Sequence, residues 1–149
     1  MPDLITHTLF VYPLKKRFPK QIILLLSGAI LPDVVGRIPG ILIQNNSLIG
    51  NYQTSVHTPL VLILLVYSLS FFFPEKVRKD VFLFLLTGVF LHFFLDLFQK
   101  TNTYAYFWFF PISLSWFQIP LIWPDETIFL MPFLVIINAA IYIFNKKSG

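Results

Sequence analysis

Residues 81–98 form an apolar run that is long enough to cross a bilayer, and two ionisable residues lie inside it. His92 and Asp96 are four positions apart, so on a helix they share one face, with Gly88 one turn earlier on that face. Ionisable groups at membrane depth are costly, and they normally face a protein interior, a cavity or a metal. A histidine and a carboxylate at this spacing can bind one divalent cation together. The run therefore indicates a membrane helix that carries a polar site.

The composition of the chain supports a membrane protein. Hydrophobic residues make up 56% of its 149 residues and charged residues only 12%, whereas soluble domains carry about 25% charged residues. One soluble core could not bury so much apolar surface, so we expect an all-α integral membrane protein with a single helical domain over residues 1–149. The chain has no cysteine, which excludes thiolate metal sites. Its net charge of +4 lies in short basic clusters, which is typical of membrane orientation, so no nucleic-acid binding is predicted.

The apolar stretches predict a compact bundle of about four to five transmembrane or half-spanning helices. Prolines and charged residues divide the chain into the expected helical segments, at 4–14, 21–31, 59–73, 80–98 and 128–144. In this interpretation Pro32 ends the second segment, and residues 34–50 form a loop or a re-entrant piece. Residues 104–123 are rich in aromatic side chains and prolines, which predicts short helices or irregular backbone along the bilayer interface rather than a clean span.

Basic residues predict how these helices are oriented. Lysine and arginine cluster at 15–20, 76–79 and 146–147, and such clusters normally remain in the cytoplasm. Four helical passes satisfy all three clusters when the N terminus begins outside. Counting about 1.5 Å of rise per residue then places every histidine, with Asp33 and Asp96, in the outer half of the membrane. We therefore expect a multi-pass inner-membrane protein whose site faces the extracytoplasmic side.

Three histidines and two aspartates at one level are sufficient for a complete metal site. The predicted ligands are His7, Asp33, His57, His92 and Asp96. Nitrogen and oxygen ligands without thiolates suit one or two divalent metal ions, with zinc the first choice and manganese or iron the second. A metal with an open position activates water and polarises a phosphoryl or carbonyl oxygen, which predicts hydrolytic chemistry at the membrane surface.

Each predicted ligand also has a structural interpretation. His92 and Asp96 could form a buried hydrogen-bonded pair that only fixes helix packing. His57 could be an interfacial residue at a helix start, and His7 could snorkel or cap a helix near the N terminus. Asp33 follows a proline and could belong to a turn. These interpretations must all hold at once, and they do not explain why every histidine lies at one level.

Two further charged residues lie near the ligands in the sequence. Arg37 follows Asp33 by four positions, and on the outer side it departs from the pattern of cytoplasmic basic residues. It is a candidate clamp for a phosphate or another anion, or alternatively a partner for an outer carboxylate or a lipid headgroup. Asp3 is a candidate extra ligand or a group that supports the ligands, or alternatively an N-cap before Thr6.

Five stretches, in order, resemble the motifs of the membrane-bound metal-dependent hydrolases, small multi-pass inner-membrane proteins distantly similar to zinc-dependent phospholipase C. They lie within residues 2–113 and read PDLITHTLF, GAILPDVVGR, VHTPL, GVFLHFFLDLF and FWFFPIS. The resemblance implies the same five metal ligands and a hydrolase. The chain departs from the family's pattern at Thr58 and Pro59, where an arginine and a nearby serine are usual, and at Val35, where a second acid is usual.

The sequence supports three classes of function. The first is a metal-dependent hydrolase acting on a phosphoester or lipid-type substrate among membrane lipids, although no general base is evident. The second is a metal-ion transporter or sensor. This class is disfavoured because the cytoplasmic half of the chain has no second set of ligands to which an ion could pass. The third is a structural membrane protein whose metal holds the helix bundle together.

Overall fold

The computed structural model describes residues 4–42, 56–100, 107–115, 117–123 and 125–147. Within these residues every regular element is a helix. In chain order the elements are α1 (Leu4–Val11), the 3-10 helix η1 (Tyr12–Lys16), α2 (Ile22–Leu42), α4 (Pro59–Ser70), α5 (Glu75–Asp96), the 3-10 helix η2 (Asp125–Phe129) and α6 (Leu130–Lys147). The prediction of an all-α protein is confirmed for these residues.

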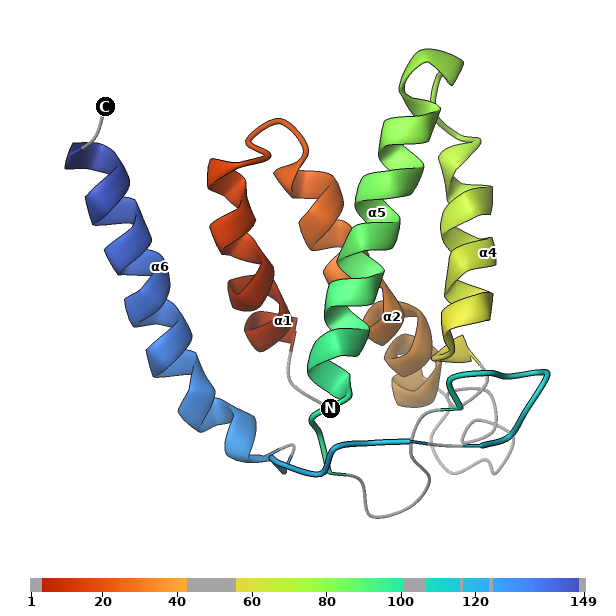
Figure 1. Cartoon of the computed structure of the whole chain (residues 1–149). Helices are drawn as coiled ribbons and strands as arrows, with labels where there is room; N and C mark the ends of the chain where they lie inside the picture. The colour runs from red at the N-terminus through yellow and green to blue at the C-terminus, as the bar shows by residue number, and fades with distance from the viewer. Residues whose placement is uncertain (1–3, 43–55, 101–106, 116, 124, 148–149) are drawn as a thin grey trace.

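Helix α5 is the central element of the bundle. It packs most extensively on α2, and α4 and α1 also contact it, whereas α6 joins the bundle chiefly through α1 (Figure 1). Two apolar clusters fill the spaces between these helices. One lies mainly between α4 and α5 and comprises Leu62, Val66, Val81, Leu85, Val89 and Phe93. The other lies between α1 and α2 and comprises Val11, Ile22, Leu25 and Ala29.

Two glycines let α2 and α5 approach each other at backbone distance. A Cβ atom at Gly28 would clash with the carbonyl group of Leu85. A Cβ atom at Gly88 would clash with the carbonyl group of Leu25 and would lie 2.8 Å from the Gly28 Cα. Small residues are the usual means of close helix crossing in membranes. The backbone of α2 therefore occupies the space beside Gly88 that a side chain would fill.

Helix α2 continues through Pro32, so the prediction that it ends there, followed by a loop, is wrong for residues 34–42. Pro32 removes one helical hydrogen bond, but packing of α2 against α5 and α1 offsets this local cost. Asp33 is consequently a fully buried helical residue and not part of a turn. The rest of the predicted loop, at 43–50, lies outside the described residues.

Among the described residues, one helix is long and apolar enough to cross a membrane by length and composition, at Glu126–Phe144. Two shorter apolar helices lie at Ile22–Gly36 and Pro59–Ser70. Helix α5 begins in a charged turn and ends at Asp96, so its apolar part is shorter than the predicted run of 81–98. Length and composition alone therefore support one span, and the remaining passes stay predictions.

Residues 107–123 form no regular helix where the structure describes them, so of the two predicted alternatives, short helices or irregular backbone, the described part shows the second. The segment runs across the end of the bundle beyond α5 (Figure 1). Trp108 attaches it to the core, because its ring lies 5.5 Å from the Phe93 ring and its Nε1 donates a hydrogen bond to the Phe117 carbonyl at 2.6 Å. Its location at the bilayer interface remains a prediction.

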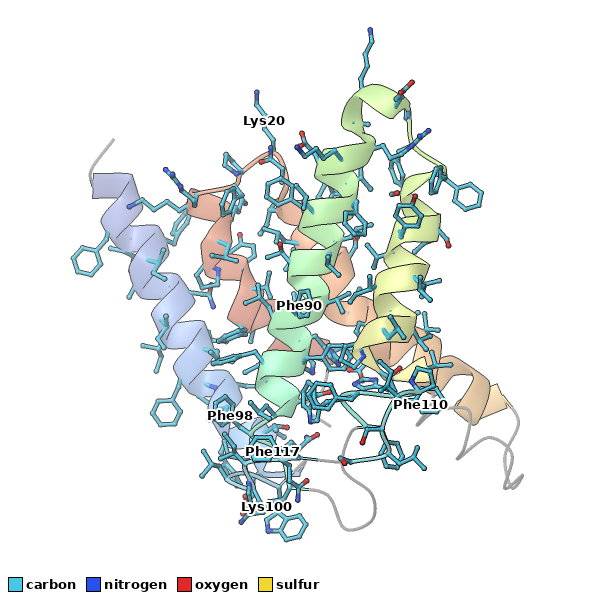
Figure 2. All side chains as sticks on the ribbon, turned by 45° about the vertical axis from the view of Figure 1, so that its right-hand side comes forward. Lys20, Phe90, Phe98, Lys100, Phe110 and Phe117 are labelled. Atoms are coloured by element: carbon cyan, nitrogen blue, oxygen red, sulfur yellow. The ribbon has the colours of Figure 1, made fainter. Side chains whose placement is uncertain are left out.

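The predicted basic clusters lie at one end of the bundle. Figure 1 shows the turn between α1 and α2, the turn between α4 and α5, and the C terminus at this end. Figure 2 shows Lys20 there and Lys100, a lysine outside the three clusters, at the opposite end. We call the first of these the basic end. The fold thus separates the clustered positive charge from the other end of the molecule, as the positive-inside interpretation requires.

Candidate metal centre

The structure brings all five predicted ligands together. They come from four segments of the chain, with His7 in α1, Asp33 in α2, His57 just before α4, and His92 and Asp96 near the end of α5. Their side chains are buried, since His57 is 4% exposed and the other four are 0% exposed. Residues that are far apart in sequence thus form one polar cluster inside an otherwise apolar bundle, close to the end opposite the basic end.

The donor atoms of three residues form a small triangle. The Asp96 Oδ2 atom lies 2.8 Å from His57 Nε2 and 3.1 Å from His92 Nε2, and the two Nε2 atoms are 3.3 Å apart. His7 Nε2 approaches from another side, 3.6 Å from Asp96 Oδ1 and 3.9 Å from Asp33 Oδ2. Asp96 therefore turns one carboxylate oxygen toward two histidines and the other toward the third.

These separations fit a metal centre. Zinc binds histidine nitrogen and carboxylate oxygen at about 2.0–2.2 Å, so in a tetrahedral site the ligand atoms are about 3.3–3.6 Å apart. Within the cluster, His7, His92 and Asp96 form one group of three possible ligands, and Asp33, His57 and His92 form another, with the donor atoms of each group within 4.8 Å of one another. The two carboxylates also supply the negative charge that stabilises a divalent ion, and the three imidazoles supply nitrogen ligands.

A backbone hydrogen bond fixes the tautomer of His92. Its Nδ1 atom lies 2.7 Å from the carbonyl oxygen of Ala29, in α2, and a carbonyl can only accept, so Nδ1 carries the proton. In its neutral form the ring presents the Nε2 lone pair to Asp96 Oδ2 and His57 Nε2. A lone pair facing a carboxylate oxygen in a buried site is unfavourable unless a proton or a cation lies between them. Metal-binding histidines are commonly held in this way by a backbone carbonyl.

Ring packing restricts the imidazoles further. The His7 ring stacks on the His92 ring with centroids 3.8 Å apart and planes at 16°. The Phe93 ring presents its edge to the His57 ring at 5.3 Å. On the other side of His57, a Cβ at Gly36 would lie 3.8 Å from Nδ1, which is ordinary contact. These contacts hold the donor atoms in place without using their ligand nitrogens.

Two predicted site residues lie wholly or partly outside the described residues. Asp3 is not among the described residues. Residue 37 lies in α2, one turn after Asp33, but the Arg37 side chain is outside the described part. Conversely, sequence reasoning missed the Ala29 carbonyl, because a backbone acceptor has no side-chain signal. The only indication in the sequence was its spacing, one helical turn before Asp33.

Helical elements, one helix long and apolar enough to cross a membrane, and a polar cluster buried at one end are features expected of a helical membrane protein. A family model described as "YdjM inner membrane protein" matches residues 4–149. The chain therefore belongs to the family of YdjM inner membrane proteins, and the prediction of an inner-membrane location is confirmed at that level. No curated protein and no solved structure matches the chain significantly. The description of the family names a location and no reaction, so the similarity to hydrolases is not confirmed.

Proposed function

We propose that this inner-membrane protein is a metal-dependent hydrolase that acts on a phosphoester or lipid-type substrate. One or two divalent ions, zinc first and manganese or iron second, would be held by His7, Asp33, His57, His92 and Asp96. In this proposal the chain crosses the membrane several times, and the centre faces the extracytoplasmic side. The observation that carries the proposal is the contact of His92 Nε2 with Asp96 Oδ2 at 3.1 Å, in a ring whose Nδ1 donates a hydrogen bond to the Ala29 carbonyl.

Each residue has a distinct role in this proposal. A divalent metal, when bound, would act as the Lewis acid that activates water and polarises a phosphoryl oxygen. His92 is oriented by the Ala29 carbonyl, so its Nε2 is available as a ligand without reorganisation. Asp96 would be a ligand for one ion or for two, because its two oxygens face different histidines. The apolar bundle around the cluster excludes bulk water and strengthens these electrostatic interactions.

A lipid-type substrate suits the surroundings of the centre. The aromatic segment at 107–123 lies across the same end of the bundle and carries exposed apolar side chains (Figure 1). The most exposed are Phe109, Ile112, Leu114, Phe117 and Leu121. Such side chains favour the interfacial region of a bilayer, where phosphoester groups of lipids lie. Arg37, one helical turn beyond Asp33 in α2, is the candidate partner for the substrate's phosphate.

Hydrolysis can be tested directly with purified protein in detergent. We expect the wild type, supplied with zinc or manganese, to release product from a phosphoester lipid. Asp33→Asn should lower the rate by roughly 100-fold, because one charged ligand is replaced by a poor one. Asp80→Asn is the matched control, since it makes the same chemical change at an exposed position in the first turns of α5. Full activity in Asp33→Asn would contradict the assignment of this ligand.

A metal that only holds the helices together is the second candidate function. Two observations favour it. The five side chains are buried, the most exposed being His57 at 4% exposure, and they come from four segments of the chain that a metal would link. In this case metal would raise the melting temperature, but no phosphoester would be hydrolysed in the same detergent. Metal flux into liposomes without hydrolysis would instead favour transport.

The proposed topology predicts which residues can be labelled from each side of the membrane. Because the chain has no native cysteine, single-cysteine variants report on one position each. In intact cells an impermeant maleimide should label Ser115→Cys and should not label Lys76→Cys, both of which replace exposed residues. Both variants should react after permeabilisation. Labelling of Lys76→Cys in intact cells would place the basic end outside and would contradict the topology.

A further inference from the structure

A second, unrelated pocket lies at the basic end of the molecule. It has a volume of about 230 Å³ and is formed where η1 and the C-terminal half of α6 face each other. Two lysines, two tyrosines, two prolines, an isoleucine and an asparagine line it, and no acidic residue is among these. A pocket with positive and apolar walls and no negative charge is suited to an anionic, amphipathic ligand.

The positive charge of the pocket is held in place. Lys15 Nζ donates a hydrogen bond to the Tyr12 hydroxyl at 3.2 Å and lies 5.3 Å from the centre of the Tyr12 ring. Both contacts stabilise the ammonium group beside the pocket. Lys16 is the next residue in the last turn of η1 and also lines the pocket. Two adjacent ammonium groups at one rim are a favourable site for a phosphate group.

Asn138 fixes the inner end of the pocket. Its Nδ2 donates one hydrogen bond to the Leu9 carbonyl of α1 at 3.0 Å and another to the Leu134 carbonyl of α6 at 2.8 Å. This link holds α6 against α1. Toward the C terminus α6 leans away from α1 (Figure 1), and on that side the pocket lies between η1 and α6. Asn138 lines the pocket at the point where α6 contacts α1.

An apolar surface continues from the pocket toward the middle of α6. Ile141 lines the pocket, and Ile137 and Phe133 follow it at intervals of one helical turn on the same face. Ile137 is 49% exposed and Phe133 is 65% exposed. A chain of methylene groups lying along this stripe would cover both residues. The combination of a cationic rim with an apolar stripe below it matches a phospholipid and does not match a free phosphate ion.

We propose that this pocket is a binding site for an anionic glycerophospholipid. The phosphate would lie between Lys15 and Lys16, and the upper part of one acyl chain would lie along Ile141 and Ile137. The bound lipid would fill the space between η1 and α6 and so would stabilise the attachment of α6, which otherwise contacts the bundle chiefly through α1. The proposal depends on the basic end lying at a membrane surface and is independent of the metal centre.

The test uses the full chain purified in a zwitterionic detergent, with phosphatidylglycerol as the probe and phosphatidylcholine as the neutral comparison. Binding is followed by native mass spectrometry and by the melting temperature. We expect phosphatidylglycerol to bind selectively, and Lys15→Gln/Lys16→Gln to weaken its binding by about 30-fold. The control is Lys76→Gln/Lys79→Gln, which removes the same charge from exposed positions at the same end, outside the pocket. It should change binding by less than about threefold.

Three results would overturn the proposal. Equal weakening in the two double variants would show that general surface charge binds the lipid. Equal binding of phosphatidylglycerol and phosphatidylcholine would remove the role of the lysines. Competition by glycerol 3-phosphate at the same concentration as the lipid would show that a soluble phosphate is the ligand. Unchanged melting temperatures of both variants without lipid would show that they are folded.

Discussion

Gly28→Ala is expected to separate α2 from α5 and to lower the free energy of unfolding by about 2–3 kcal/mol. The added methyl group would occupy the position of the Leu85 carbonyl, and backbone cannot move aside as a flexible side chain can. For a chain of this size the loss corresponds to a decrease in melting temperature of about 5–10 °C. The variant should also bind metal less tightly, because Ala29, whose carbonyl orients His92, is the next residue.

Gly36→Ala is the matched control for this prediction. It adds the same methyl group to the same helix, but there the new Cβ atom would lie 3.8 Å from His57 Nδ1, which is an ordinary van der Waals distance. Replacing a helical glycine by alanine without a clash is worth about 0.5–1 kcal/mol in favour of folding. The two variants should therefore change the melting temperature in opposite directions. Equal melting temperatures would show that α2 and α5 do not cross at backbone distance.

Asp96→Asn is expected to abolish stabilisation by metal while leaving the metal-free protein at least as stable as the wild type. Without metal, the wild-type Asp96 Oδ2 faces the lone pair of His92 Nε2. An asparagine amide of the same shape can donate a hydrogen bond to that lone pair and relieve the unfavourable contact. With metal at 100 times its dissociation constant, the wild type should gain about 2.7 kcal/mol, and the variant should gain nothing.

The measurement is the melting temperature of each protein with zinc and with a chelator. The competing explanation is a buried pair of protonated His92 and ionised Asp96 with no metal. In that case Asp96→Asn would leave a buried charge without its partner and would destabilise the chelated protein by about 3–5 kcal/mol. A strongly destabilised variant and a wild type insensitive to zinc would therefore contradict the metal centre. Asp80→Asn, at an exposed position of α5, should behave as the wild type throughout.

Local sequence rules predicted part of the site. The spacing of His92 and Asp96 places them on one face of a helix, and both are buried there. The basic clusters predicted that His7 and His57 lie at the same depth in the membrane as Asp96. In the structure both histidines lie beside the Asp96 carboxylate. The proximity of these side chains could be predicted because helical periodicity and charge asymmetry act over short segments or whole passes. Their level in the membrane remains a prediction. Whether the cluster binds a metal remains a prediction.

Long-range packing explains what could not be predicted. Pro32 is a local signal for a helix end, but contacts along α2 with two other helices outweigh it. The stacking of His7 on His92 and the acceptance of a hydrogen bond by Ala29 depend on the crossing of helices distant in sequence. No periodicity within one helix encodes such a crossing. Gly28, which contributes to this crossing together with Gly88, was not recognised from the sequence. Only the backbone of the partner helix shows why a side chain is excluded at that position.

The most direct test of the metal centre is the metal content of the full-length protein. The chain should be purified without a histidine tag, incubated separately with zinc, manganese and iron, and dialysed before mass spectrometry of the metals. We expect near-stoichiometric retention of at least one of the three in the wild type, and its loss in both His92→Ala and Asp96→Ala. Absence of bound metal from the wild type after all three incubations would contradict the account, and His92 and Asp96 would then form a buried polar pair.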